Sequence, residues 1–232
     1  MSEIEIKTLD GAGRFKAYVA KPEGTPRAAI VVIQEIFGVN RGIRQKCDHL
    51  AADGYLAIAP DLFWRIEPGI ELDPDVEAEM NQALGLMGKF DQDQGIKDIE
   101  ATIRAARTHL PDGGKVGVVG YCLGGRLAYM TAARTDVDAS VGYYAVGIDG
   151  LLGEKDAIAN PLMLHIAGDD GFVDKETQAK MHLGLDDHPK VTLHDYPGED
   201  HGFATEVGNR RSPQAADEAD ARTRGFFAKH LG

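Results

Sequence analysis

A single cysteine stands where a predicted buried strand must turn into a helix. Cys122 lies in the segment Gly120-Tyr121-Cys122-Leu123-Gly124-Gly125, directly after the apolar run at residues 115–119. Glycines two residues on either side let a strand and a helix approach closely, and the residue between them is held in a strained backbone conformation. The sulfur then lies near a helix N-terminus, which stabilises a thiolate. The spacing predicts a nucleophilic Cys122, and the alternative is an unreactive core cysteine.

Eight histidines compete for the role of a base beside this thiol. His201 lies in the segment 197–203, after the last predicted strand, whereas His165 and His194 lie inside predicted strands. Reacting groups gather beyond the carboxyl ends of parallel strands, so His201 is the histidine that we expect to face Cys122. It would accept the thiol proton and later activate water.

Three aspartates follow the predicted strand at residues 162–167 and are candidates to orient the imidazole. They are Asp169, Asp170 and Asp174, and spacing alone does not separate Asp169 from Asp170. The alternative to a catalytic acid is that these residues are surface carboxylates of a loop. The chain order nucleophile, acid, histidine is that of an α/β-hydrolase and fits each of them, and we choose Asp170.

Acyl transfer also requires two amide N–H donors for the oxygen that becomes negatively charged. We expect one from Leu123, just after the nucleophile, and one from Ile36, in the loop after the apolar run 28–33. Glu35 follows the same run and should face the same cleft. It is either a surface residue, an acceptor for the thiol proton, or a partner that keeps a neutral Cys122 less prone to oxidation.

The elements that must position these residues alternate along the chain. A hairpin is predicted at residues 3–8 and 14–20, buried strands at 28–33, 55–59, 116–119, 141–145 and 162–167, and a last strand at 191–196. Helices are predicted at 41–53, 91–109, 125–134, 174–183 and 213–230, with an irregular loop at 60–74 and a cap helix at 75–89. The pattern predicts an α/β fold, with a mostly parallel sheet covered by helices on both faces and an antiparallel N-terminal hairpin at its edge.

Composition limits the class of protein. The 232 residues suit one domain spanning 1–232. A net charge of −12 with a pI near 5.1 argues against nucleic acid or an anionic membrane as partner. Two cysteines, remote from each other in sequence, favour a reducing compartment, and the N-terminal residues lack a signal-like apolar core, so we expect a cytoplasmic protein. The histidines and cysteines show no metal-ligand spacing, and we expect no metal and no cofactor.

The chain resembles the dienelactone hydrolase family, also called carboxymethylenebutenolidases. The resemblance runs nearly end to end and rests on these segments: Gln34-Glu35-Ile36-Phe37-Gly38-Val39-Asn40, Pro60-Asp61-Leu62-Phe63, Gly117 to Gly125, Val141-Gly142-Tyr143-Tyr144, Asp170-Gly171-Phe172-Val173 and His201-Gly202-Phe203. The cysteine elbow together with the segment at 34–40 is the most specific of them.

The resemblance implies an α/β-hydrolase fold and a Cys-His-Asp triad at Cys122, His201 and Asp170. It also implies that Glu35 helps to generate the thiolate when substrate binds and that Tyr144 lines the site. We add three aromatic residues as further substrate contacts: Phe37, Trp64 and Phe203. The family substrate is a carboxylate-bearing enol-lactone.

In the best-known family members two arginines bind that carboxylate, and the chain departs from the family at both positions. Met80 and Thr205 stand at those places, and Arg65, Arg126 and Arg210 are candidate substitutes. The expected partner is therefore a small lactone or ester, hydrolysed through a thioester by a monomer or small homo-oligomer. The alternatives are a broad-specificity carboxylesterase of the same family without dienelactone activity, a non-catalytic module that binds small carboxylates, and a thiol redox protein.

Overall fold

The computed structural model describes residues 2–232. Its strands are β1 (Ser2–Lys7), β2 (Arg14–Ala20), β3 (Ala29–Ile33), β4 (Leu56–Pro60), β5 (Val116–Tyr121), β6 (Ala139–Tyr143), β7 (Leu162–Ala167) and β8 (Val191–Tyr196). Its α-helices are α1 (Arg41–Ala52), α2 (Glu77–Met87), α3 (Gln92–Thr108), α4 (Leu123–Arg134), α5 (Lys175–Leu185) and α6 (Pro213–Leu231). Two 3₁₀ segments lie at Pro111–Gly113 and Asp149–Ala157.

The strands form one sheet in the order β1-β2-β4-β3-β5-β6-β7-β8. The six strands from β4 to β8 pair in parallel, whereas β1 pairs with β2, and β2 with β4, in antiparallel fashion. The predicted α/β fold with an antiparallel hairpin at its edge is therefore confirmed. Parallel pairing brings the carboxyl ends of β3, β5, β7 and β8 to one edge of the sheet, which is where the candidate site residues follow.

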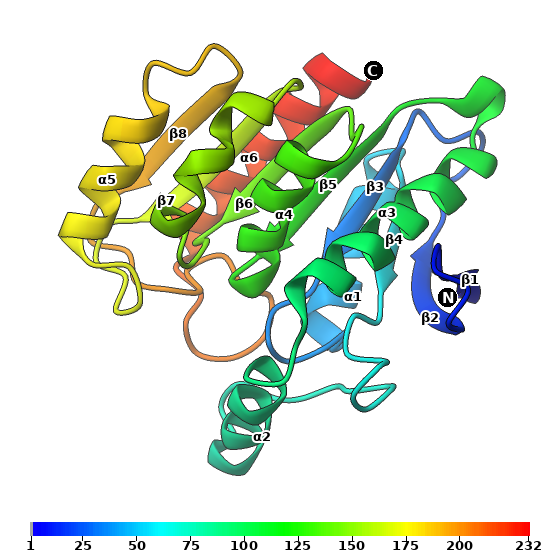
Figure 1. Cartoon of the computed structure of the whole chain (residues 1–232), viewed down its shortest axis with the longest axis horizontal. Coiled ribbons are helices and arrows are strands. Elements are labelled where there is room, and N and C mark those ends of the chain that lie inside the picture. Colours follow the sequence, from blue (N-terminus) through cyan, green and yellow to red (C-terminus); the bar gives the residue numbers. More distant parts are fainter. Residues whose placement is uncertain (1) are drawn as a thin grey trace.

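Helices cover both faces of the sheet (Figure 1). Helices α3, α4 and α5 lie on one face, and α1 and α6 lie on the other. Every residue of β3, β4 and β5 is buried, because apolar side chains on both sides of these strands pack against a helix layer. The core accordingly divides into two apolar clusters, one on each face.

Side-chain caps fix the starts of two helices near the site. Asn40 accepts hydrogen bonds from the backbone N–H groups of Gly42 and Ile43 and so begins α1, and its own amide donates to the carbonyl of Leu72. Asp91 caps α3 in the same way. The Asn40 contact also ties the loop that carries Glu35 to the irregular segment before α2.

The structure differs from the predicted boundaries at two places that matter for the site. β5 runs to Tyr121 and α4 begins at Leu123, so a single residue separates strand from helix, where the apolar pattern predicted a gap at 120–124. β6 ends at Tyr143 rather than at residue 145. Tyr144 has a φ of 36°, which is outside the extended region that a strand requires.

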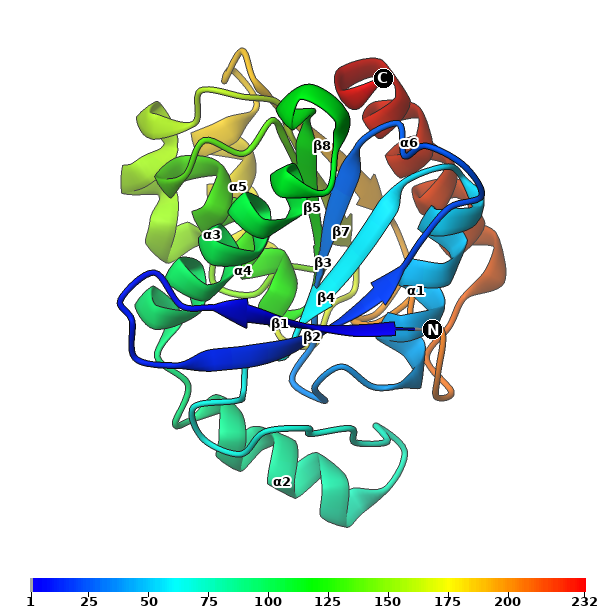
Figure 2. The ribbon, with the colours of Figure 1, turned by 90° about the vertical axis from the view of Figure 1, so that its right-hand side faces the viewer.

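Helix α2 stands apart from the sheet, below the hairpin in Figure 2. It packs on the rest of the molecule mainly through Ala83 and Leu86, which are buried. None of the helices described for residues 2–232 is both long and apolar enough to cross a membrane.

Candidate active site

Cys122 occupies the turn between β5 and α4 in a strained conformation. Its φ of 57° and ψ of −115° lie outside the regions that a residue with a side chain normally adopts, and its side chain is half-buried. The turn is this tight only because Gly120 and Gly124 lack side chains. A Cβ at Gly120 would collide with the carbonyl of Gly124, and one at Gly124 would lie 2.6 Å from the carbonyl oxygen of Gln34. The predicted elbow is thus present, with the thiol at the N-terminus of α4.

His201 and Asp170 meet beside this thiol. The imidazole Nδ1 of His201 lies 2.8 Å from Oδ2 of Asp170, and their side chains are only 6 % and 1 % exposed. Burial by itself lowers the pKa of His201, but the hydrogen bonds and charges of Asp170 and Cys122 outweigh it and raise the pKa to about 10. At neutral pH the imidazole therefore carries a proton between a carboxylate and a sulfur atom.

The structure separates the candidate aspartates. Asp170 is buried, and its second oxygen accepts a hydrogen bond of 2.8 Å from the backbone N–H of Phe172. Asp169 is exposed and pairs with Lys175 at 3.2 Å, and Asp174 caps α5. Of the three, Asp170 alone contacts the imidazole.

Asp200 is a residue that sequence reasoning missed. Its Oδ1 accepts hydrogen bonds from the backbone N–H of His201 at 2.7 Å and from that of Gly171 at 3.1 Å. These donors, first that of His201, lower the pKa of Asp200 although burial opposes them. Asp200 therefore joins the loop of His201 to the loop of Asp170. The only signal in the sequence was a carboxylate next to the candidate histidine.

Two backbone N–H groups near the thiol have no partner. Leu123 is the first residue of α4, and Ile36 lies in the loop after β3; neither amide donates a hydrogen bond to another group within residues 2–232. The loop is held by the fully buried Gln34, whose Oε1 accepts from the N–H of Leu62 at 3.0 Å and whose Nε2 donates to the carbonyl of Glu35 at 3.2 Å. These free amides fit the donors that an oxyanion requires.

Glu35 and Tyr144 lie together in the depth of the site. Burial raises the pKa of the Glu35 carboxyl, and the positive charges of His201, Lys46 and Arg210, with the Tyr144 hydroxyl, oppose it only in part. The Tyr144 ring lies 5.0 Å from that of His201, and its buried hydroxyl has no regular hydrogen-bond partner in the described part of the chain. Glu35 is therefore not a surface carboxylate.

The three aromatic residues named from sequence have different neighbours. The indole of Trp64 donates to Asp98 at 2.8 Å and stacks on Phe15 of β2, three strands away from β5. Phe203 is 1 % exposed and packs behind Tyr144, and Phe37 is buried in the core. The Trp64 ring fills the gap between the hairpin and α3. The roles of Phe37, Trp64 and Phe203 as substrate contacts stay predictions.

One aromatic ring that sequence reasoning passed over does face solvent at the site. Phe172 is 63 % exposed, and its ring lies 4.9 Å from that of His201 in an edge-on arrangement. An exposed phenyl group beside the imidazole is a surface that an apolar part of a ligand can contact.

The candidate arginines differ in their partners. Arg65 pairs with Asp98 at 2.9 Å and lies over Trp64, and Arg126 donates to Gln92 and to the carbonyl of Gly147. Arg210 has no ion-pair partner within residues 2–232, and its stem packs on Gly202, next to His201. Its charge also lowers the pKa values of Glu35 and Asp200. Arg210 is thus the cation that remains available at the site.

At the other two positions, Met80 packs against the core, and the buried Thr205 donates its hydroxyl to the carbonyl of Val207.

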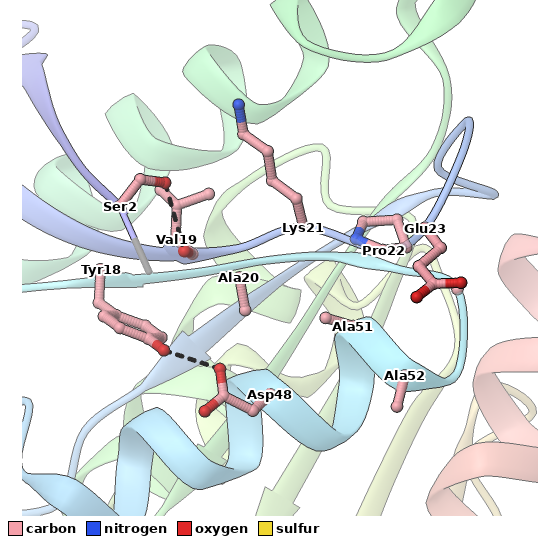
Figure 3. Close-up of a pocket in the computed structure, with 11 residues that line it drawn as sticks. Ser2, Tyr18, Val19, Ala20, Lys21, Pro22, Glu23, Asp48, Ala51 and Ala52 are labelled. Atoms are coloured by element: carbon pink, nitrogen blue, oxygen red, sulfur yellow. Dashed lines mark hydrogen bonds between the residues drawn. The ribbon is translucent and has the colours of Figure 1, made fainter.

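A hollow of about 600 Å³ lies elsewhere, between β2 and the C-terminal half of α1 (Figure 3). Tyr18 and Asp48, joined by a hydrogen bond of 2.7 Å, line it together with Lys21 and Glu23. It contains none of the candidate site residues. In the described residues no group of three or more histidine, cysteine or acidic side chains is arranged to hold a metal ion.

Comparison with known proteins decides the family. The family model described as the dienelactone hydrolase family matches residues 15–231. The chain belongs to the dienelactone hydrolase family. It is 47 % identical to a putative carboxymethylenebutenolidase of Azospirillum brasilense over the full length of both chains. It is 40 % identical to the carboxymethylenebutenolidase of Pseudomonas putida, over 97 % of this chain and 95 % of the relative.

Solved structures agree with this assignment. A putative dienelactone hydrolase from Klebsiella pneumoniae superimposes with a TM-score of 0.83 and 26 % identity, over 99 % of this chain and all of that one. A dienelactone hydrolase-like promiscuous phosphotriesterase from metagenomic libraries shares the fold, with a TM-score of 0.78 and 20 % identity. The prediction of a hydrolase from the dienelactone hydrolase family is confirmed.

Proposed function

We propose that this protein hydrolyses a small lactone or ester by nucleophilic attack of Cys122. The observation that carries the proposal is the buried pair of His201 and Asp170, 2.8 Å apart, whose imidazole also contacts Cys122 and has a pKa raised to about 10. A protonated imidazole beside a sulfur atom favours the thiolate, and the α4 N-terminus adds to that preference.

The thiolate attacks the carbonyl carbon, and the carbonyl π electrons move to the oxygen, where the amides of Leu123 and Ile36 stabilise the negative charge. Collapse of this intermediate breaks the C–O bond, and His201 gives its proton to the leaving oxygen. The product is a thioester on Cys122. His201 then takes a proton from water, the resulting hydroxide attacks the thioester, and the carboxylate product leaves with the thiolate restored.

Glu35 serves as the second proton acceptor. Whenever His201 holds a proton, a neutral Cys122 thiol needs another group to take its own. A buried carboxyl group with a raised pKa accepts a proton more readily than an ordinary carboxylate does, and Glu35 is such a group. Tyr144, whose hydroxyl lies free beside it, lines the same wall.

The substrate carries a carboxylate that pairs with Arg210. The support is that this guanidinium has no ion-pair partner in the described part of the chain, that its stem packs on Gly202, and that its charge acts on Glu35. A carboxylate of the substrate would form a bidentate pair there. The relatives named carboxymethylenebutenolidase make an enol-lactone the first substrate to test. A broad-specificity esterase is the second candidate, favoured by the exposed Phe172 ring, which suits an apolar acid or alcohol group.

The deciding experiment compares the wild type with Cys122→Ala on a lactone and on an activated aryl ester. We expect the substitution to lower kcat by at least about 10³-fold, because the nucleophile is lost. Rapid acid quench and mass spectrometry should find the acyl group on Cys122 in the wild type. An unchanged rate in Cys122→Ala would refute the mechanism. Binding of carboxylates without any turnover in the wild type would instead identify a non-catalytic module. We expect a cytoplasmic, cofactor-independent enzyme that is a monomer or small homo-oligomer.

A further inference from the structure

Lys46 is a buried cation that the proposed chemistry does not use. It lies on α1 with 8 % of its side chain exposed. Its ammonium nitrogen is 2.8 Å from Oε1 of Glu206 and 3.1 Å from Oδ2 of Asp220. Removing an ammonium group from water costs several kcal/mol, so a lysine in such a place requires compensating charges, and these two carboxylates provide them.

The partners of Lys46 belong to segments that carry the reacting groups. Glu206 lies five residues after His201, in the same loop. The Lys46 ammonium also lies 5.3 Å from the centre of the Tyr121 ring, and Tyr121 directly precedes Cys122. Helix α1, which carries Lys46, begins a few residues after Glu35. One ammonium group therefore joins the His201 loop, the elbow strand and the helix that follows the Glu35 loop.

Other ionisable groups surround the partners of Lys46. Arg211 is a second cation of the cluster, 3.3 Å from Glu206 and 3.9 Å from Asp220, and it also pairs with the exposed Asp217 at 3.2 Å. The His49 imidazole lies 3.8 Å from Glu206, and the Tyr143 hydroxyl donates to Asp220 at 2.9 Å. Lys46, Arg211, Glu206 and Asp220 line a hollow of about 530 Å³. Loss of Lys46 alone leaves an excess negative charge against Tyr121.

The same ammonium acts on Glu35 through space. The groups whose charges or hydrogen bonds reach the Glu35 carboxyl are His201, Lys46, Arg210 and Tyr144, and the three cations all favour the ionised form. Glu35 in turn disfavours ionisation of Tyr121 and Tyr144, and Cys122 also disfavours ionisation of Tyr144. Of the three cations, His201 reacts and Arg210 is exposed, so Lys46 is the fixed one.

We propose that Lys46 is a positioning residue of the Cys122 centre: it fastens the His201 loop to α1 and supplies the buried positive field that favours ionised Glu35 and Cys122. The inference rests on the thiol chemistry proposed above. The inference predicts the sign of each effect. Loss of the Lys46 cation must make Glu35 and Cys122 harder to ionise, whereas loss of the Glu206 carboxylate must make them easier to ionise.

The test is the pH dependence of Cys122 alkylation by iodoacetamide in the intact chain, followed by mass spectrometry. Cys47 is fully buried and burial raises its thiol pKa, so it does not compete in the folded protein, and Cys122→Ala gives the background. We expect Lys46→Met to move the midpoint to higher pH by about half a unit or more. Lys46→Arg should restore the wild-type midpoint, and Glu206→Gln should lower it.

Two comparisons separate this role from a purely structural one. Lys155→Met removes the same charge from a lysine that binds only the carbonyl of Gly184, and it should leave the profile unchanged. A Lys46→Met profile that coincides with the wild type, or a shift that Lys155→Met reproduces, overturns the inference.

If Lys46→Met does not fold, the double variant Lys46→Met/Glu206→Gln, which loses one charge of each sign, replaces it. Its alkylation profile is compared with that of Glu206→Gln. If the two profiles coincide, the inference is overturned. Ester turnover by the wild type and by Cys122→Ala is measured in parallel. If the proposed function is wrong, the wild type will not hydrolyse the ester faster than Cys122→Ala, whatever the alkylation midpoints are.

Discussion

At the scale of single residues, the free guanidinium of Arg210 has the most direct consequence for substrate choice. Arg65 and Arg126 already have polar partners, and Met80 and Thr205 provide no charge. A substrate carboxylate placed near His201 would therefore depend on Arg210 alone. An exposed arginine without an ion-pair partner among residues 2–232 is available for that purpose at little cost.

We expect Arg210→Ala to raise the KM of a carboxylate-bearing lactone by about 10-fold or more, since a charged hydrogen-bonded pair is worth about 1.5–3 kcal/mol. The KM of a neutral ester of similar size should change little. Steady-state kinetics with the two substrates provide the check, with Arg65→Ala as a control at a paired arginine. Equal effects of Arg210→Ala on both substrates would contradict a carboxylate contact.

A second prediction at this scale concerns Glu35. Glu35→Gln keeps the shape of the side chain but removes its ability to accept the thiol proton. We expect slower alkylation of Cys122 near neutral pH and a pH profile displaced from that of the wild type, because a buried carboxyl with a raised pKa no longer takes part. Alkylation rates across the pH range measure this. An identical profile would leave Glu35 with a structural role only.

At the scale of elements, the junction of β5 and α4 determines where the sulfur lies. The junction has one residue between strand and helix, and the helix passes close to the end of β3. We expect Gly124→Ala to destabilise the protein by about 2 kcal/mol or more, because its Cβ would press on the backbone carbonyls of Ile33 and Gln34. Urea unfolding and ester turnover provide the measurements.

The matched control for this substitution is Gly153→Ala. A Cβ at Gly153 meets nothing within 4 Å, so stability and turnover should stay close to the wild type. Loss of stability in both variants to the same extent would show that the elbow has no special steric demand.

At the scale of the whole molecule, the buried pair of His201 and Asp170 links stability to pH. The pKa of His201 rises from 6.5 to about 10 on folding, so the pair stabilises the folded state fully below pH 6.5 and progressively less as the pH rises towards 10. The difference in unfolding free energy between wild type and His201→Gln should therefore shrink between pH 6 and pH 10. Urea titrations at both values check it, with His188→Gln as a surface control. A constant difference would contradict the raised pKa.

Much of the architecture could be predicted from the sequence because the central strands are apolar on both faces and parallel pairing sends their carboxyl ends to one edge. Cys122 and Glu35 follow such strands, and His201 follows the parallel edge strand β8, so the parallel topology accounts for their convergence. Other features depend on tertiary contacts. A turn that buries Asp170 and exposes Asp169 has no local signature, and the direction of the Trp64 ring is set by Phe15 and Asp98. The catalytic roles and the single domain at 1–232 stay predictions.

The hydrogen bonds that Asp200 accepts have a consequence for evolution and for protein engineering. One carboxylate oxygen binds the main chain of both loops that bear the acid and the base. Neither loop can change its length or backbone path without moving the other. Transplanting a loop from a relative to alter specificity should therefore succeed only when both segments are exchanged together, and variation should concentrate in the more loosely attached α2 region instead.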